Sequence, residues 1–69
     1  MDRGFPQILK ELRLHDKLTY KQLAAKIGYH LSMIGSWELG QAEPKMSALI
    51  ALADHFGVSL DYLVGRKDY

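Results

Sequence analysis

The chain has 69 residues, of which 48% are hydrophobic and 25% are charged, and a formal net charge of +1. This balance is typical of a folded protein and excludes a disordered tail. The sequence has no cysteine, which excludes disulfides and thiolate metal sites, and no apolar run approaches the ~20 residues that span a bilayer. We therefore expect one domain over residues 1–69, without a signal peptide or a membrane partner, in a reducing cytoplasmic setting.

Charge is unevenly distributed along the chain. Residues 1–27 carry six Lys or Arg against three Asp or Glu, whereas residues 28–69 carry three against five. A positive patch is thus expected on the first two helices. Such a patch can touch a DNA backbone, although charge alone favours the plainer interpretation of a solvated helix face.

The spacing of apolar residues predicts an all-α fold of five short helices. The first helix is expected to begin at Pro6, whose fixed φ suits a first turn, and to run to about Asp16. Its core stripe is Phe5, Leu9 and Leu12. Leu18 is expected to be buried in the loop that follows.

The next two helices should form a compact pair. Thr19 with Gln22 three residues later is a capping box, which marks the start of a helix. Gly28 follows the apolar stripe of that helix, where a left-handed residue would end it. The segment from Leu31 to Leu39 forms the second member. Two short helices joined by a turn that contains glycine match a helix-turn-helix, here over about residues 19–40.

Two more helices complete the chain. Pro44 delays helix formation after the preceding loop. Met46 to Phe56 is then strongly amphipathic, with a core stripe at i, i+3, i+4 and i+7 formed by Leu49, Leu52, Ala53 and Phe56. The last short helix is expected from Leu60 to Val64, with Ser59 as its cap.

A helical wheel divides the third helix into two halves. The inner half carries Met33, Ile34, Trp37 and Glu38, and the outer half carries Leu31, Ser32, Gly35, Ser36 and Leu39. Glu38 needs a cationic partner, because a buried unpaired carboxylate is very costly. Arg13, which follows a core residue of the first helix, is the obvious candidate, and we interpret the pair as structural.

Three spaced motifs extend this pattern over nearly the whole chain. They are Leu-Thr-x-x-x-Leu-Ala-x-x-Ile-Gly at 18–28, Ile-x-x-Trp-Glu-x-Gly at 34–40 followed by Pro44, and Ala-x-x-Phe-Gly-Val-Ser-x-Asp-x-Leu at 53–63. Together they resemble the Cro/phage-repressor, or Xre-like, helix-turn-helix family. The resemblance implies a lambda-repressor-like fold with the third helix in the DNA major groove. It also implies a dimer contact on the last helix, for which the candidates are Leu60, Val64 and Tyr69.

The same resemblance assigns the DNA contacts. The base-facing residues would be His30, Leu31, Ser32, Gly35 and Ser36, and the backbone contacts would be Tyr20, Lys21, Gln22 and Lys45. The outer face departs from DNA-binding members, whose matching positions are rich in Gln, Arg, Lys, Asn and Ser. Ser32 and Ser36 can still donate to bases, and Leu31 can contact a thymine methyl group. His30 stands where a capping Ser or Thr is usual.

Two functions are compatible with these features. The first is a sequence-specific DNA-binding transcriptional regulator of the phage-repressor type, which binds a double-stranded operator as a homodimer. The alternative is a protein-binding antirepressor or modulator on the same fold, which binds a repressor protein and blocks its DNA surface. An enzyme is not expected, because the three histidines are spread over three elements and no serine sits in a nucleophile elbow. No cofactor or metal is expected either.

Overall fold

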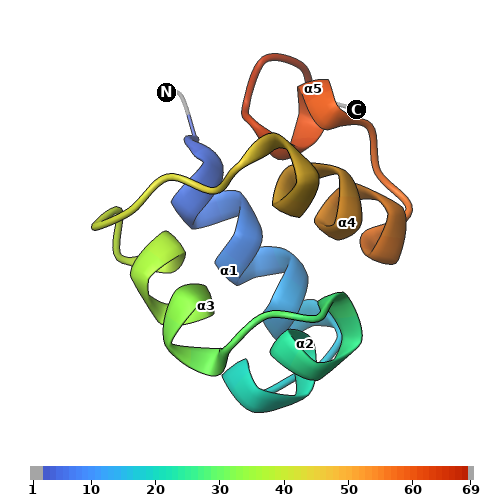
Figure 1. The fold of residues 1–69 in the computed structure, drawn as a ribbon. Helices are drawn as coiled ribbons and strands as arrows, with labels where there is room; N and C mark the ends of the chain where they lie inside the picture. Colours follow the sequence, from blue (N-terminus) through green and yellow to red (C-terminus); the bar gives the residue numbers. More distant parts are fainter. Residues whose placement is uncertain (1–2, 69) are drawn as a thin grey trace.

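The computed structural model describes residues 3–68, which form five helices (Figure 1). The helices are α1 (Phe5–His15), α2 (Tyr20–Ile27), α3 (Leu31–Glu38), α4 (Met46–Phe56) and α5 (Leu60–Leu63). Residues 3–68 contain no strand. The predicted all-α fold of five short helices is confirmed, and none of these helices is long and apolar enough to cross a membrane.

Four helix ends differ from the prediction by one residue, and one of them is the end of α1, which stops at His15 with Asp16 as its C-cap. α1 begins at Phe5 rather than Pro6, with Gly4 as its N-cap, because proline is tolerated anywhere in a first turn where no amide hydrogen is needed. α3 and α5 each end one residue earlier than predicted, because Leu39 and Val64 take the C-cap positions.

The predicted capping box at the start of α2 is present. The Thr19 hydroxyl accepts from the Gln22 amide at 3.1 Å, and the Gln22 side-chain oxygen accepts from the Thr19 amide at 2.8 Å. Gly28 ends the helix with φ 80°, the left-handed conformation that glycine adopts without strain. Ser59 caps α5 as predicted, because its hydroxyl accepts from the Tyr62 amide at 3.0 Å.

Every helix contributes to one hydrophobic core. Its buried members are Ile8, Leu9, Leu23, Ala24, Ile34, Trp37, Ala48, Leu52, Ala53 and Leu63. Several residues predicted for the core are only half-buried and pack around its edge, namely Phe5, Leu12, Leu18, Leu49 and Phe56. The described chain is therefore held together by a small number of large apolar side chains, which is expected at this size.

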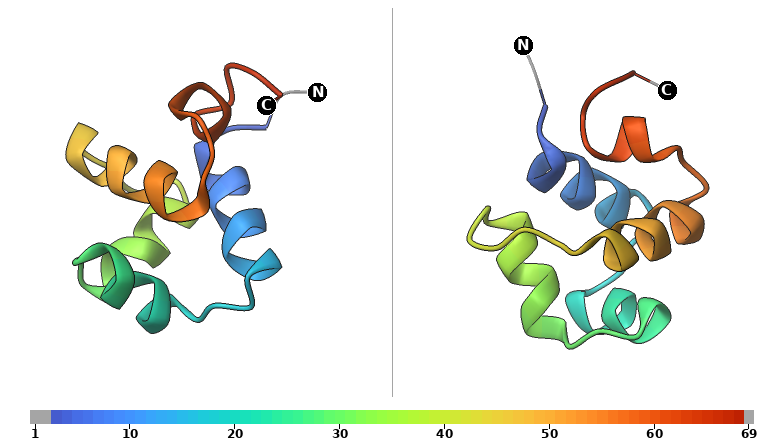
Figure 2. Two further views of the ribbon diagram at one scale, coloured as in Figure 1. Left: turned by 90° about the vertical axis from the view of Figure 1, so that its right-hand side faces the viewer. Right: turned by 45° about the horizontal axis from the view of Figure 1, so that its top comes forward.

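The helices divide between two ends of the molecule. α2 and α3 pack on each other at one end, and α5 lies beside the start of α1 at the other (Figures 1 and 2). α1 runs between the two ends and contacts both α3 and α5. The helix-turn-helix pair therefore stands away from the end that carries α5.

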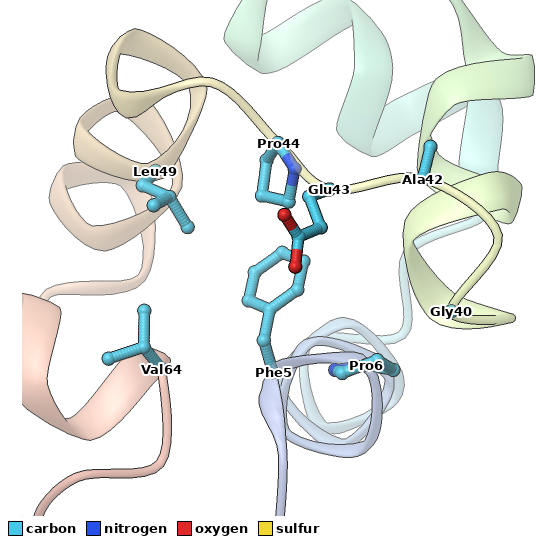
Figure 3. Close-up of a pocket in the computed structure, with 8 residues that line it drawn as sticks. All are labelled: Phe5, Pro6, Gly40, Ala42, Glu43, Pro44, Leu49 and Val64. Carbon is cyan, nitrogen blue, oxygen red and sulfur yellow. The ribbon is translucent and has the colours of Figure 1, made fainter.

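An open, mostly apolar hollow of about 470 Å³ lies where α1, α4, α5 and the α3–α4 loop meet (Figure 3). Its lining consists of Phe5, Pro6, Gly40, Ala42, Glu43, Pro44, Leu49 and Val64. Val64, the C-cap of α5, is half-buried there, and Leu60 at the start of α5 is 39% exposed. The third predicted dimer contact, Tyr69, lies outside the described residues.

Arg3 connects the start of the described chain to α5. Its guanidinium pairs with Glu11, donates to the Tyr62 hydroxyl at 3.3 Å and lies 5.8 Å from the centre of the Tyr62 ring. Its carbonyl oxygen approaches Gly65 so closely that a Cβ atom added there would lie 2.3 Å from it. Gly65 is thus needed for space as well as for its φ of 84°.

A comparison of Gly57→Ala with Gly65→Ala separates the need for a left-handed φ from the need for space. Gly57 has φ 69° and no neighbour within 4 Å of an added Cβ atom, so its replacement introduces backbone strain alone. We expect urea denaturation to show a loss of about 1–2 kcal/mol for Gly57→Ala. Gly65→Ala should lose at least about 1 kcal/mol more, because Arg3 must also move. Equal losses in the two variants would show that the contact with Arg3 does not constrain the fold.

Candidate nucleic-acid interface

The turn between α2 and α3 is fixed by its backbone and by one aromatic side chain. The amides of Gly28 and Tyr29 both donate to the carbonyl of Ala24, at 2.9 and 3.0 Å. The Tyr29 ring then packs edge-on against Trp37 of α3, with 5.3 Å between ring centres. Its hydroxyl lies 3.3 Å from the Ser47 hydroxyl of α4. Tyr29 therefore contacts α3 through Trp37 and α4 through Ser47, and these contacts set the angle at which α3 leaves the turn.

A bidentate ion pair holds the other end of α3. Arg13 of α1 donates through Nε to Glu38 Oε2 at 2.5 Å and through Nη2 to Glu38 Oε1 at 3.1 Å. The third nitrogen, Nη1, donates to the Leu18 carbonyl at 2.8 Å. Only 11% of the Arg13 side chain and 2% of the Glu38 side chain are exposed. The hydrogen bonds and charge attraction with Glu38 raise the pKa of Arg13, against the opposing effect of burial.

Tyr20 covers this ion pair. The Arg13 guanidinium lies 4.5 Å from the centre of the Tyr20 ring, a favourable cation–π arrangement. The Tyr20 ring also meets α3 at Gly35, where an added Cβ atom would lie 3.4 Å from Tyr20 Cε2. Tyr20 was predicted to contact a DNA phosphate, but its ring is used in packing, which leaves its hydroxyl for that contact.

The outer half of α3 is less open than the helical wheel indicates. Gly35 was predicted to face DNA, but it is half-buried beside Tyr20, and Ser36 is also half-buried. The exposed positions are at the two ends of the helix, where Leu31 is 42% and Leu39 is 69% exposed and Ser32 is exposed. We call His30, Leu31, Ser32, Ser36 and Leu39 the outer face of α3.

His30 is the N-cap of α3. Its Nδ1 atom accepts from the Ser32 amide at 3.1 Å and lies 2.9 Å from the Ser32 hydroxyl. An imidazole thus fills the role that Ser or Thr usually has at this position. The sequence pattern marked His30 as a departure and missed this role, although an unprotonated ring nitrogen is an acceptor like a hydroxyl oxygen.

The predicted backbone contacts differ in how much of each side chain remains available. Lys21 is exposed on the first turn of α2, and Lys45 is exposed at the N-cap of α4. Gln22 is exposed, but its side-chain oxygen accepts within the capping box, so only its amide nitrogen can reach a phosphate. Among residues 3–68, no group of three His, Cys, Asp or Glu side chains is placed to hold a metal ion.

The buried ion pair gives a direct stability prediction. Arg13→Ala or Glu38→Ala leaves an uncompensated buried charge, so each should lose about 3–5 kcal/mol of unfolding free energy. A domain of this size rarely has more than that to lose, so both variants should be largely unfolded by circular dichroism at 25 °C.

Glu11→Ala is the matched control for Glu38→Ala. Glu11 is also paired with an arginine, Arg3, but 53% of its side chain is exposed. Its removal should therefore cost no more than about 1 kcal/mol. If Glu38→Ala and Glu11→Ala melt within a degree or two of each other, the Arg13–Glu38 pair does not stabilise the fold as described.

The comparisons with known proteins agree with this geometry. A family model described as Helix-turn-helix, HTH_3, matches residues 9–63. The uncharacterized HTH-type transcriptional regulator YobD of Bacillus subtilis (strain 168) is 42% identical over 62 residues, which cover 90% of this chain and 55% of YobD. The chain spans about half the length of the Bacillus subtilis relatives it matches.

Two solved structures show the same fold. The P22 c2 repressor, in complex with a synthetic operator, matches with a TM-score of 0.88 and 25% identity, over 94% of this chain and 98% of that one. The restriction-modification controller protein C.AhdI from Aeromonas hydrophila matches with a TM-score of 0.79 and 30% identity, over 86% and 89%. From the matched motif, the relatives and the fold, the chain belongs to the helix-turn-helix family of Cro and phage-repressor type.

Proposed function

We propose that this chain is a DNA-binding transcriptional regulator of the Cro/repressor type, and that α3 enters the major groove of an operator. One observation carries the proposal. α3 is held by buried contacts of Trp37 and Glu38 in its last turn while Leu31 and Ser32 in its first turn stay exposed, on a fold that matches an operator-bound repressor over 94% of the chain. A helix held in this way can present side chains to bases in a constant orientation.

The proposed contacts lie at exposed or half-buried positions of α2, α3 and the start of α4. His30, Leu31, Ser32 and Ser36 would face the bases, with Gly35 giving α2 and α3 their close approach instead of a base contact. Lys21, Lys45, the Gln22 amide group and the Tyr20 hydroxyl would contact phosphates. Phosphate contacts would supply most of the affinity, and the outer face would supply register and sequence preference.

We also propose that the regulator is a cytoplasmic homodimer that binds a two-fold operator. Leu60 and Val64, with Tyr69, are the proposed dimer contacts, and the partial exposure of Leu60 is compatible with this role. A binding role without catalysis is supported by the family and by the regulators among its relatives.

Salt dependence tests the proposed phosphate contacts. Each phosphate neutralised by a lysine releases counterions, so binding to duplex DNA should weaken steeply as salt rises. Lys21→Ala and Lys45→Ala should each weaken binding to all duplexes alike and reduce the slope of log K against log salt by about 1. Fluorescence anisotropy with a labelled mixed-sequence duplex measures both effects.

Lys67→Ala is the charge-matched control. Lys67 follows α5, at the end of the molecule away from α2 and α3, and pairs with Asp61 at 3.8 Å. Its replacement removes the same charge but should leave the slope unchanged. If all three variants change the slope equally, the DNA affinity comes from net charge and not from contacts at the helix-turn-helix.

One observation favours the alternative function of a protein-binding modulator that docks on a repressor. Leu31 and Leu39, which are 42% and 69% exposed, stand at the two ends of the outer face of α3. The outer-face residues between them, Ser32 and Ser36, are small, and the outer face carries no Lys, Arg or Gln. Such a surface also suits an apolar protein partner.

The double variant Leu31→Lys with Leu39→Lys separates the two functions. Both positions are exposed, so thermal unfolding should change little. Two added cations should preserve or increase affinity for duplex DNA by attraction to phosphates. An apolar protein complex would weaken instead, because the ammonium groups would lose water on binding. The modulator function is favoured if the wild type shows no salt-sensitive DNA binding.

A further inference from the structure

Two polar side chains at the start of α3, those of His30 and Ser32, make hydrogen-bonding contacts with each other in the free protein. His30 and Ser32 are both exposed on the outer face of α3. The His30 Nδ1 atom lies 3.1 Å from the Ser32 amide nitrogen and 2.9 Å from the Ser32 hydroxyl oxygen. The two residues are therefore in contact in the free protein, without DNA.

This contact determines which nitrogen of His30 carries the proton. A backbone amide can only donate, so Nδ1 must accept, and a neutral imidazole then holds its hydrogen on Nε2. The two nitrogens are separated by Cε1 and their bonding directions diverge, so the Nε2–H is not directed at the Ser32 amide that Nδ1 caps. In the neutral, capped state, His30 presents an N–H donor to its surroundings and no acceptor.

The same contact determines whether the Ser32 hydroxyl can donate or accept a further hydrogen bond. With Nδ1 unprotonated, the hydroxyl at 2.9 Å can only be the donor of the side-chain contact, and it shares the single Nδ1 lone pair with the Ser32 amide. The lone pairs of Ser32 Oγ remain available, and they can only accept. The sequence pattern predicted Ser32 as a donor to bases, and this geometry reverses that assignment.

We propose that His30 and Ser32 together determine sequence specificity, with His30 as a hydrogen-bond donor and Ser32 as a hydrogen-bond acceptor. His30 Nε2–H would donate to a guanine, whose major-groove edge offers the N7 and O6 acceptors. Ser32 Oγ would accept from the amino group of an adjacent cytosine or adenine. The inference rests on the proposed DNA-binding function. It makes the start of α3 responsible for recognising two adjacent base pairs of the operator.

Nuclear magnetic resonance of the free protein tests the fixed proton without DNA. In a long-range ¹H–¹⁵N spectrum of the wild type at about pH 8, where an imidazole is ordinarily uncharged, the Nε2–H tautomer of His30 should dominate. His15 is the internal control, because its side chain is 87% exposed and its Nδ1 lies 3.4 Å from an Asp16 carboxylate oxygen, which can only accept. A His30 spectrum showing mainly the Nδ1–H tautomer would overturn the inference.

Selection from a pool of randomised duplexes tests the reading of bases. His30→Ser keeps a capping oxygen but is too short to donate to a base, and His30→Asn keeps both a capping oxygen and a donor. Wild type should prefer guanine at one position by about two- to tenfold, which is the range of one hydrogen bond. The preference should disappear in His30→Ser and persist in part in His30→Asn, while both variants melt close to wild type.

The outcomes distinguish this inference from the proposed function. If the wild type retains no duplex at all, the proposed function fails and the reading role fails with it. If the wild type binds DNA and His30→Ser keeps the guanine preference, only the present inference is overturned, since His30 is then a cap and nothing more. An equal loss of affinity for every sequence in His30→Ser also overturns it, because that result assigns His30 to a phosphate.

Discussion

The orientation of α3 depends on the ion pair between Arg13 and Glu38. The guanidinium joins three parts of the chain, because it lies on α1, pairs with the end of α3 and donates to the loop before α2. Both side chains are almost completely buried, so neither charge can be left alone without a large cost. Tyr20 adds α2 to the same arrangement by covering the guanidinium. One arginine thus links the three helices that form and support the helix-turn-helix.

Because this ion pair holds α3 from its inner side, the outer face needs no charged or amide side chain to fix the helix. Its inner side is committed to the core through Ile34 and Trp37, and Tyr29 packs on Trp37 from the turn. The helix is held by contacts that no DNA partner needs to supply. Its first turn can then carry an imidazole as its cap, and its middle can be small enough for Tyr20 to approach Gly35.

Features with a strong local signal could be predicted from the sequence. The capping box at Thr19, the left-handed Gly28 and the Ser59 cap each depend on residues within a few positions of one another. The partnership of Arg13 and Glu38 was also predictable, although 25 residues separate them, because a carboxylate on an apolar helix face requires a cation.

Features that depend on tertiary contact could not be predicted in this way. A helical wheel places Gly35 outward and cannot show that Tyr20 of the neighbouring helix covers it. The approach of the Arg3 carbonyl to Gly65 joins opposite ends of the described chain and leaves no periodic signal. His30 was visible as a candidate contact, but its role as a cap depends on the rotamer that brings Nδ1 to the Ser32 amide.

Chemical-shift mapping of the ¹⁵N-labelled protein with a mixed-sequence duplex tests most directly whether α3, held by the Arg13–Glu38 pair, is the DNA-contacting element. The largest amide shifts should fall on the start of α2 and on residues 30–36, and the shifts should shrink as salt is added. The Arg13 Nε–H resonance should remain in place, because the ion pair is already formed in the free protein. Shifts concentrated on α4 and α5, with α3 unchanged, would contradict the proposed interface.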